Sequence, residues 1–360
     1  MQVEVSRSAV LNAVSRCSAA RGRTGNLGLV QLNSMAGALA IYATDGEVSL
    51  RHVIPIDHST PAFCVLVNSD KLRQVLTLAT GDVVRLGVVG SSLTIATDRG
   101  QWLLGVSTST LPAAAFDESG RSVKVVSDVL AAGLSYCLAA STNESNQPAL
   151  GGVHLVGNSA NLILAGTDTR RLHVYFAGVI EVGDNVEGVL PAKACKVADG
   201  ILDAGTATVE INGKAFRILS GPWELCSPLL SGRFPDWRKV WPEEFVREDT
   251  LPVGDLLRLV RMSSVITSED SRGVDYIFGA DTIEAKSQAA SIGESTVSVP
   301  IEGGNAAQVT RTIDPDFLRE MLQHLEPTEN VAVRITPDDG HLAFESARFS
   351  ALICPMASNR

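Results

Sequence analysis

Aromatic residues are scarce in this 360-residue sequence: they make up 5% of the chain, so aliphatic side chains must fill most of the core. No apolar run reaches the length of a membrane-spanning helix, and the opening MQVEVSRSAV lacks the apolar centre of a secretion signal. The sequence therefore predicts a cytoplasmic protein. The length of the chain and its 45% hydrophobic content predict two or three domains, each with its own core.

Paired cysteines and clustered histidines are also missing. The six cysteines are scattered and no two of them form a CxxC pair, which argues against a disulfide framework or a zinc site. The six histidines are equally dispersed; His154 and His173 fall in alternating, strand-like patterns without a second ligand at metal spacing. We expect reduced thiols, no metal site and no cofactor.

Known catalytic motifs and an excess of positive charge are lacking as well. The chain has no Gly-rich phosphate loop, no HExxH and no GxSxG, and the GSS at 90–92 has the composition of a hairpin turn. The net charge is −10. Proteins that hold DNA by neutralising its phosphates are normally basic, so the overall charge by itself argues against that mode of binding.

What the sequence does contain is a pattern that occurs three times. Each copy begins with apolar residues at helical spacing and then switches to two alternating strands around a Gly-containing turn. Equivalent strand positions Val84, Val209 and Val333 are 125 and 124 residues apart, a period that indicates whole domains in tandem. The copies cover 69–98, 191–221 and 314–346.

A second helix-plus-strands pattern precedes each copy, so that every third of the chain has two such halves. This organisation predicts an α+β protein with three similar domains at 1–122, 123–247 and 248–360. The preceding helical stripes are Val10, Val14 and Cys17, then Leu130, Leu134, Cys137 and Leu138, then Leu257, Val260 and Ser264.

One charged segment interrupts this apolar pattern. LAGTDTRRLHVYF, residues 164–176, holds Asp168 between two threonines with Arg170 and Arg171 directly after it. One hypothesis is an enzyme that uses Asp168 with the two arginines, but no second acid or base is identifiable nearby. The other is a turn, because Thr-Asp also occurs in the equivalent ATDGEVSL at 43–50 and such side chains bond the nearby backbone. We expect Asp168 to be structural, and the two arginines to serve a purpose specific to the middle domain.

Five segments resemble those of the bacterial DNA sliding clamp, the beta subunit of DNA polymerase III. The resemblance runs in the same order from end to end, and GRFPDWRKVWP is its most specific part. The segments are STLPAAAFDES (109–119), LPAKACKVADGIL (190–202), LLSGRFPDWRKVWP (229–242), SEDSRGVDYIF (268–278) and ALICPM (351–356).

The resemblance implies three tandem clamp domains per chain and a head-to-tail homodimeric ring around duplex DNA, with helices lining the bore. Twelve helices about 10 Å apart give a circle of roughly 120 Å and a bore of nearly 30 Å, wide enough for hydrated duplex. A closed ring retains DNA by topology, so only a mild positive field inside an acidic body is needed. The implied function is that of a polymerase processivity factor without catalytic residues of its own.

The helices carry the cations that would face the DNA. The alternative is that these are ordinary solvated helix faces. The residues are Arg16, Arg21, Arg23, Lys71, Arg73, Lys193, Lys196, Arg258, Arg261 and Arg319.

The resemblance also implies a pocket in which replication proteins dock short peptides through leucine or phenylalanine anchors. The implied partners are the DNA polymerase III catalytic subunit, the clamp loader and other proteins with a clamp-binding motif. The pocket residues would be Leu150, Thr167, Thr169, Arg170, Arg171, Leu172, Pro235, Lys239, Val240, Leu352, Cys354, Pro355 and Met356.

Some positions depart from the family pattern. Thr169-Arg170 stands where Gly-His or a similar pair is usual, and Thr108 replaces a typical aliphatic at the ring interface, which would pair Val106 and Thr108 with Val265 and Ile266. These departures keep a second interpretation open: a diverged duplicate of a clamp with a specialised role in drug tolerance, repair or a mobile replicon.

Overall fold

The chain forms two compact units, seen in a computed structural model. The structure describes residues 2–35, 37–57, 62–114, 116, 120–142, 144, 146–158, 160–183, 185–269, 271–301, 308–338 and 340–356. Unit 1 comprises 1–131, 156–160 and 178–230, and unit 2 comprises 132–155, 161–177 and 231–360. The boundary between the units runs through the segment predicted as the middle domain. The division into three domains stays a prediction.

The helices form where the sequence places apolar stripes, and three of the described helices start behind a polar capping residue. Ser6, Asn68 and Asp314 each accept a backbone N–H of the first turn with their side-chain oxygen. The predicted stripes are buried, for example Val10 and Val14 in the first helix. The α-helices are α1 (Arg7–Cys17), α2 (Ser69–Leu78), α3 (Ser127–Leu138), α4 (Ala192–Asp199), α5 (Val253–Ser263) and α6 (Pro315–Leu322). Short 3-10 turns are η1 (Ser18–Ala20), η2 (Gly25–Gly28), η3 (Pro148–Leu150), η4 (Trp237–Val240) and η5 (Ser264–Ile266).

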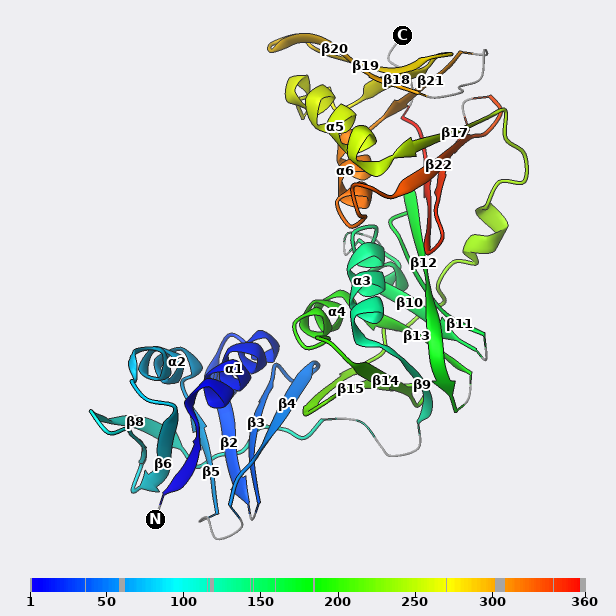
Figure 1. The fold of residues 1–360 in the computed structure, drawn as a ribbon. Coiled ribbons are helices and arrows are strands. Elements are labelled where there is room, and N and C mark those ends of the chain that lie inside the picture. Colours follow the sequence, from blue (N-terminus) through cyan, green and yellow to red (C-terminus); the bar gives the residue numbers. More distant parts are fainter. Residues whose placement is uncertain are drawn as a thin grey trace. The chain divides into compact units, whose positions relative to one another are not determined.

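Unit 1 places α1 and α2 side by side against antiparallel strands (Figure 1). β4 pairs with β16, with His52 opposite Trp223, and this pairing joins strands of 1–122 to strands of 123–247 in one sheet. The strands that lie wholly in unit 1 are β1 (Val3–Ser6), β2 (Val30–Met35), β3 (Ala38–Thr44), β4 (Ser49–Pro55), β5 (Phe63–Val67), β6 (Val83–Val89), β7 (Ser92–Ala96), β8 (Gln101–Ser107), β9 (Arg121–Val126), β13 (Val186–Pro191), β14 (Thr206–Ile211), β15 (Ala215–Ser220) and β16 (Trp223–Pro228).

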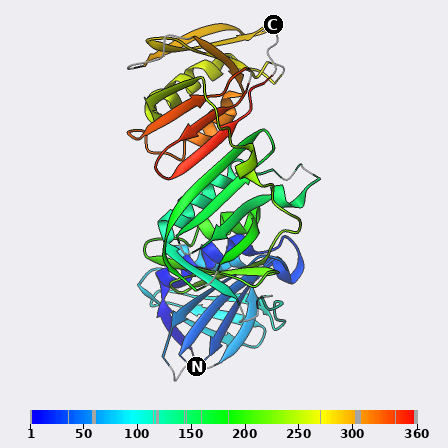
Figure 2. The same ribbon diagram turned by 90° about the vertical axis from the view of Figure 1, so that its right-hand side faces the viewer.

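In unit 2, α5 and α6 lie side by side between a four-stranded sheet and strands β17 and β22 (Figures 1 and 2). The four-stranded sheet has the order β20-β19-β18-β21, and a second antiparallel series runs β17-β22-β23-β24-β12. The remaining strands are β10 (Gly152–Gly157), β11 (Asn161–Thr167), β12 (Arg171–Val182), β17 (Arg247–Pro252), β18 (Val274–Phe278), β19 (Thr282–Ala289), β20 (Gly293–Pro300), β21 (Val309–Ile313), β22 (Asn330–Ile335), β23 (Leu342–Glu345) and β24 (Phe349–Ile353).

β11 approaches the end of α3 closely in unit 2. A Cβ added at Gly166, near the end of β11, would lie 1.9 Å from the carbonyl oxygen of Cys137 at the end of α3. Only glycine fits at that distance. This contact positions the turn that follows β11.

A fully buried ion pair lies in the core of unit 2. The guanidinium of Arg247 on β17 donates to both carboxylate oxygens of Asp249, at 2.6 and 3.0 Å, and to the Phe278 carbonyl at 3.0 Å. Both side chains are 0% exposed. A buried charge of this kind is tolerated because every charged atom has a partner, so the pair ties β17 to the end of β18.

No helix in the described ranges is both long enough and apolar enough to cross a membrane.

The buried Arg247–Asp249 pair leads to a prediction for stability. Replacing Asp249 by Asn should lower the free energy of unfolding by about 3–5 kcal/mol, because Arg247 would keep its charge in the core without a counter-ion. The measurement is the urea unfolding transition of each variant. Glu248→Gln is the matched control: its neighbouring carboxylate is half-exposed and pairs with Arg334 at 2.9 Å, so the loss should stay below about 1 kcal/mol. Equal losses for the two variants would contradict the assignment.

Candidate functional site

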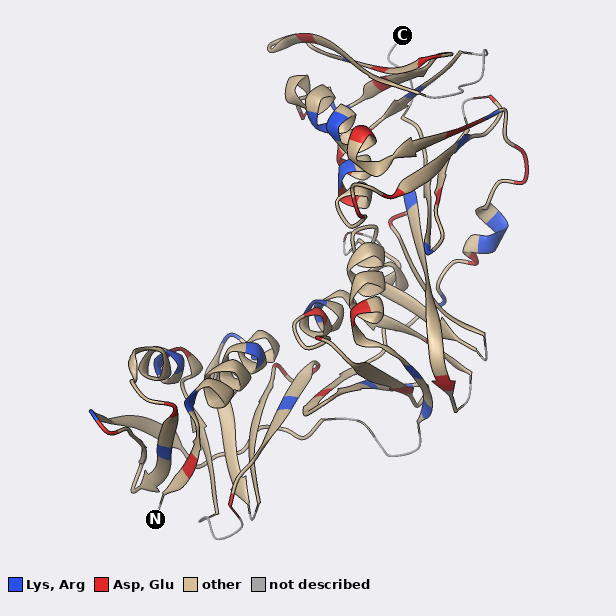
Figure 3. Ribbon diagram, in the orientation of Figure 1, with Lys and Arg blue, Asp and Glu red and all other residues tan. Residues whose placement is uncertain are grey.

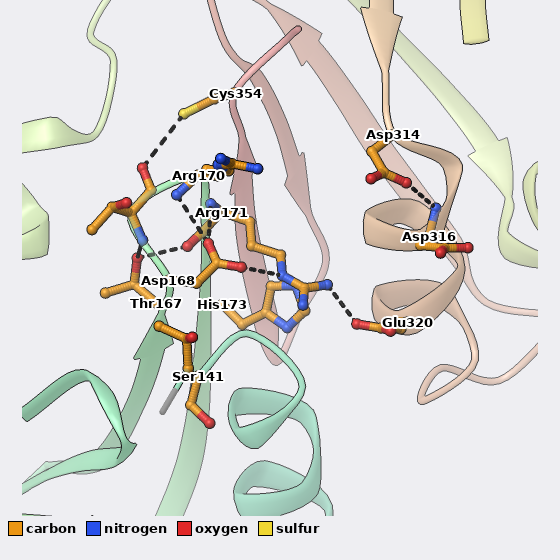
Figure 4. A network of polar contacts seen from close by, with 12 residues as sticks. Ser141, Thr167, Asp168, Arg170, Arg171, His173, Asp314, Asp316, Glu320 and Cys354 are labelled. Carbon is orange, nitrogen blue, oxygen red and sulfur yellow. Dashed lines mark hydrogen bonds and ion pairs between the residues drawn. The ribbon is translucent and has the colours of Figure 1, made fainter. Parts of the chain in front are cut away.

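The charged segment singled out in the sequence forms a tight, hydrogen-bonded turn between β11 and β12 (Figure 4). Asp168 Oδ1 accepts the backbone N–H groups of Arg170 and Arg171, both at 2.9 Å. The Thr167 hydroxyl donates to the Arg171 carbonyl at 2.6 Å and accepts the Thr169 N–H at 3.1 Å. These are bonds of the Asx and Ser/Thr turn types, so Asp168 holds the backbone as the turn hypothesis expects.

Thr169 carries backbone strain within this turn. Its φ is 78°, in the left-handed region that β-branched residues rarely adopt. The surrounding hydrogen bonds hold it there, together with the Cys354 N–H, which donates to the Arg170 carbonyl at 2.8 Å. Strained residues of this kind persist where the surrounding structure fixes them, and they cluster at functional sites.

Arg171 is held in place by charged and aromatic neighbours. Its Nε donates to Asp168 Oδ2 at 3.0 Å and its NH1 donates to Glu320 Oε2 on α6 at 2.7 Å. Its guanidinium carbon lies 4.5 Å from the centre of the Phe317 ring, and its side chain is only 9% exposed. Arg171 therefore reaches from β12 to α6, and both carboxylates balance its charge (Figure 4).

The strand register sorts the predicted pocket residues onto two faces. Arg171 lies opposite Ile353, and Leu172 lies opposite Leu352, in the antiparallel pairing of β12 with β24. Side chains alternate along a strand, so Leu172 and Leu352 face away from the helices that contact Arg171 and His173. The structure thus brings two predicted apolar residues together, although each is buried in the isolated chain.

The linker after β16 supplies the second group of predicted residues. Phe234 stacks on His154 of β10 at 4.7 Å, which anchors the start of the linker in unit 2. Pro235 is exposed, and on η4 Val240 is 57% and Lys239 78% exposed. Leu150 of η3 is buried.

The segment after β24 supplies the third group. The Met356 N–H donates to the Thr312 carbonyl at 2.8 Å, while its residue surface is 41% exposed. Cys354 and Pro355 are half-buried beside it, and burial raises the pKa of the Cys354 thiol. Pro235, Val240 and Met356 are thus the predicted apolar pocket residues that are exposed. Residues 357–360, which follow Met356, lie outside the described residues.

His173, beside this surface, is fully buried and neutral. Its Nδ1 donates to the Tyr136 carbonyl at 2.8 Å and its ring stacks on Tyr136 at 4.6 Å. Nε2 has no partner among the described residues. Because burial penalises the charged imidazolium, the pKa of His173 falls to about 3.

The predicted DNA-facing cations divide into three groups; Figure 3 marks Lys and Arg positions in blue. The first group, Arg16 and Lys193, bonds within unit 1 to residues distant in sequence. Arg16 on α1 donates to the Gly200 carbonyl and to Asp203, both at 2.6 Å. Lys193 on α4 pairs with Asp45. These two bonds connect α1 and the turn after β3 to α4 and the residues that follow it.

A second group pairs with an acid near the start of a helix: Arg21 reaches across to Asp70 of α2, and the other members pair with an acid on their own helix. Arg21 and Arg73 share Asp70, at 3.0 and 3.6 Å, and both Arg258 and Arg319 have an acid three residues earlier. The third group has no carboxylate partner among the described residues and is exposed on the surface. It comprises Arg23, Lys71, Lys196 and Arg261.

The predicted interface residues are only partly exposed. Val265 is 70% exposed and Thr108 is exposed, whereas Val106 and Ile266 are half-buried. Other exposed apolar side chains, which were not predicted from the sequence, lie on β8 and on two helices. These are Leu78 on α2, Leu103 on β8 and Met262 on α5. The run WLLGV of β8, in which apolar residues occupy both strand faces, was the available signal.

Among the described residues, no cluster of three or more His, Cys, Asp or Glu side chains could hold a metal ion.

The sequence of this chain is similar to sequences of bacterial sliding clamps. Residues 124–236 match the family model of the DNA polymerase III beta subunit, central domain. The chain is 28% identical over 192 residues to the beta sliding clamp of Staphylococcus aureus, an alignment that covers 51% of this chain and 49% of the relative. The chain thus spans about half the length of the curated relatives it matches.

Solved structures match over nearly the whole chain. The DNA polymerase III subunit beta of Pseudomonas aeruginosa has a TM-score of 0.91 at 18% identity, covering 99% of this chain and 100% of that one. The Helicobacter pylori beta clamp bound to a DNA ligase peptide has a TM-score of 0.87 at 18% identity, with coverage of 99% and 100%. The resemblance to the bacterial sliding clamp is confirmed, and so is the predicted α+β clamp fold of the single chain. The three-domain division and the ring stay predictions.

His173 should make stability depend on pH. The unfolded chain binds a proton near pH 6.5 and the folded chain only near 3, so the contribution is complete above 6.5 and is lost as pH falls toward 3. The expected slope is about 1.4 kcal/mol per pH unit. Urea unfolding at a series of pH values should show a shallower slope for His173→Phe, which keeps a flat ring against Tyr136. Parallel slopes for the two proteins would contradict this account.

Proposed function

We propose that this chain, whose fold is that of the bacterial sliding clamp, is a DNA polymerase processivity factor. Two copies form a head-to-tail ring that encircles duplex DNA, each copy contributing three clamp domains at 1–122, 123–247 and 248–360. The observation that carries the proposal is the clamp fold over 99% of the chain, together with the central-domain match at 124–236. The ring acts by tethering partner enzymes and has no reaction of its own.

Ring closure in this proposal uses the exposed apolar side chains of the first and last domains. Leu78 and Leu103 join Val106 on one copy, with Thr108 as a polar neighbour, and Met262 joins Val265 and Ile266 on the other. Burying such side chains contributes about 25 cal/mol per Å² of apolar area, so they favour association of the two copies. An exposed apolar set on a soluble domain is typical of an interface.

Encirclement reconciles DNA binding with a net charge of −10. Arg23, Lys71, Lys196 and Arg261 provide positive charge without an internal acid. The paired residues Arg73, Arg258 and Arg319 add to it, because exposed ion pairs three residues apart are worth little and rearrange readily toward phosphate. The result is a weak, mobile attraction that permits sliding, while topology provides retention.

Partner proteins dock on unit 2 in this proposal. The surface is formed by the turn 167–171, the paired strands β12 and β24, the linker 231–246 and Met356. Support comes from the Helicobacter pylori relative, whose structure holds a DNA ligase peptide. The partners are the polymerase III catalytic subunit, the clamp loader and other proteins with a clamp-binding peptide.

A second candidate is a specialised clamp paralogue acting in drug tolerance, repair or a mobile replicon. The strained Thr169 and the neighbouring Arg170, which stand where relatives usually have Gly-His, favour it. Processive synthesis by the host's own replicative polymerase with this clamp would favour the main role over the specialised one.

Met356 should be an anchor contact for the docked peptide. Met356→Ala is expected to weaken binding of a labelled clamp-binding peptide by about tenfold, because the apolar contact is lost. The measurement is fluorescence polarisation. Met35, which is exposed in unit 1, provides the matched control, and Met35→Ala should leave the affinity unchanged. An equal effect of both changes would remove Met356 from the docking surface.

Retention on DNA should depend on topology. After loading by a clamp loader, the protein should stay on a nicked circular plasmid for many minutes and leave within seconds once the plasmid is cut open. Gel filtration of the labelled complex before and after cutting measures this. Equal retention on cut DNA with free ends would exclude encirclement. Blocking both ends with a bound protein should restore retention.

A further inference from the structure

We propose that Asp45 is a positioning residue for α4. From the turn between β3 and β4, its carboxylate supplies the negative charge that the first turn of α4 lacks, and it does so by pairing with Lys193. The two residues are 148 positions apart in sequence and both lie in unit 1. The order of α4 therefore depends on a turn from an earlier part of the chain.

The start of α4 differs from that of the other described α-helices. Pro191, which precedes it, has no side-chain oxygen that could accept a backbone N–H, and residues 192–195 include no acid. Each of the other α-helices has a capping side chain, as α1 has in Ser6, or an acid in its first turn. Lys193 instead puts a cation in the first turn of α4, where the partial positive charge of a helix N-terminus disfavours it.

Asp45 balances this cation with a carboxylate that its own turn holds in place. Oδ1 accepts the backbone N–H groups of Glu47 and Val48, at 2.9 and 2.8 Å. The Thr44 hydroxyl closes the same turn by donating to the Val48 carbonyl at 2.9 Å. Oδ2 accepts Lys193 Nζ. One oxygen thus fixes the carboxylate, and the other is directed at the lysine of α4.

The surroundings of Asp45 favour its charged form. Burial by itself would raise the pKa of the Asp45 carboxyl, but the hydrogen bonds from Lys193 and from the two backbone N–H groups outweigh burial, so the pKa is lowered. The Asp45 side chain is 19% exposed, whereas that of Lys193 is 43% exposed. The acid is held by the turn while the lysine reaches solvent, so dissolved salt can screen the pair.

The turn at 167–171 repeats this arrangement in unit 2. Asp168 Oδ1 accepts two backbone N–H groups, and Oδ2 accepts a side chain, that of Arg171. Arg171 in turn donates to Glu320 on α6, and its side chain is only 9% exposed. In both turns one carboxylate oxygen holds the backbone and the other holds a cation at a helix from a later part of the chain. The contact of Asp45 is the more exposed of the two, so it should be the one that salt weakens.

The test is hydrogen exchange of the full chain, followed by mass spectrometry at the peptides that cover α4. Asp45→Asn keeps an oxygen for the two backbone N–H groups of the turn and loses the charge that pairs with Lys193. The α4 backbone should exchange about three- to tenfold faster in this variant at roughly 0.05 M salt, because the start of the helix opens more often. The factor should shrink toward one at about 0.5 M salt.

Lys193→Gln separates the effect of charge from damage to the turn. Without the cation, α4 no longer needs the carboxylate, so the double variant should exchange its α4 backbone more slowly than Asp45→Asn alone. Asp98→Asn is the matched control. Asp98 follows β7 in unit 1, is 90% exposed and pairs with Arg85 at 3.2 Å, so the same change in net charge there should leave the exchange of α4 unchanged.

Equal exchange of α4 in wild-type protein and in Asp45→Asn would overturn the proposal. So would a faster exchange that Lys193→Gln does not relieve, that persists in full at about 0.5 M salt, or that Asp98→Asn causes equally. Faster exchange of α1 and α2 to the same degree as α4 would also overturn it, because the change would then be general. The experiment uses neither DNA nor a peptide, so each of these results would leave the proposed function intact.

Discussion

The antiparallel pairing of β12 with β24 is the contact on which the proposed docking surface depends. It joins residues 182 positions apart, Arg171 and Ile353, and places the end of the chain beside the turn at 167–171. Without it, Leu172 and Leu352 would not lie opposite each other, and Arg170 would not lie beside Cys354. The same pairing buries His173 against α3 and directs Arg171 to α6, so the apolar and charged parts of the site are fixed together.

Charge in this protein is largely balanced within the fold. Arg247 and Asp249 neutralise each other in the core, Arg171 is balanced by two acids, and several helix cations have an acid one turn away. The burial of each pair decides what it does. A buried pair holds strands together because an unpaired charge there would be costly, whereas an exposed pair is worth little and leaves its cation open to exchange with phosphate. An acidic chain can therefore present a mobile positive surface.

The turn at 167–171 shows how local strain and display of a side chain are linked. Thr169 is strained in the left-handed region, and five hydrogen bonds around it keep it there. A glycine would adopt the same backbone with less strain in the folded state and more freedom in the unfolded chain. The present sequence instead has a stiff turn, and the arginine that follows it is held with little freedom of its backbone.

The sequence by itself determined the elements whose cause is local. Apolar spacing predicted the buried stripes of the helices, such as Val10 with Val14 and Leu72 with Leu76. Residues four positions apart lie on one face of a helix, so the spacing alone puts them together. The Thr-Asp turn was also predictable, since its hydrogen bonds link residues two to four positions apart. The tertiary structure decided the rest. Consecutive residues of a strand point to opposite faces, so only the position of β24 and α6 determines that Arg171 is neutralised while Arg170 is exposed. The bonds of Arg16 to Asp203 and of Lys193 to Asp45 could not be predicted either, because they join residues far apart in the sequence that only the folded chain brings together.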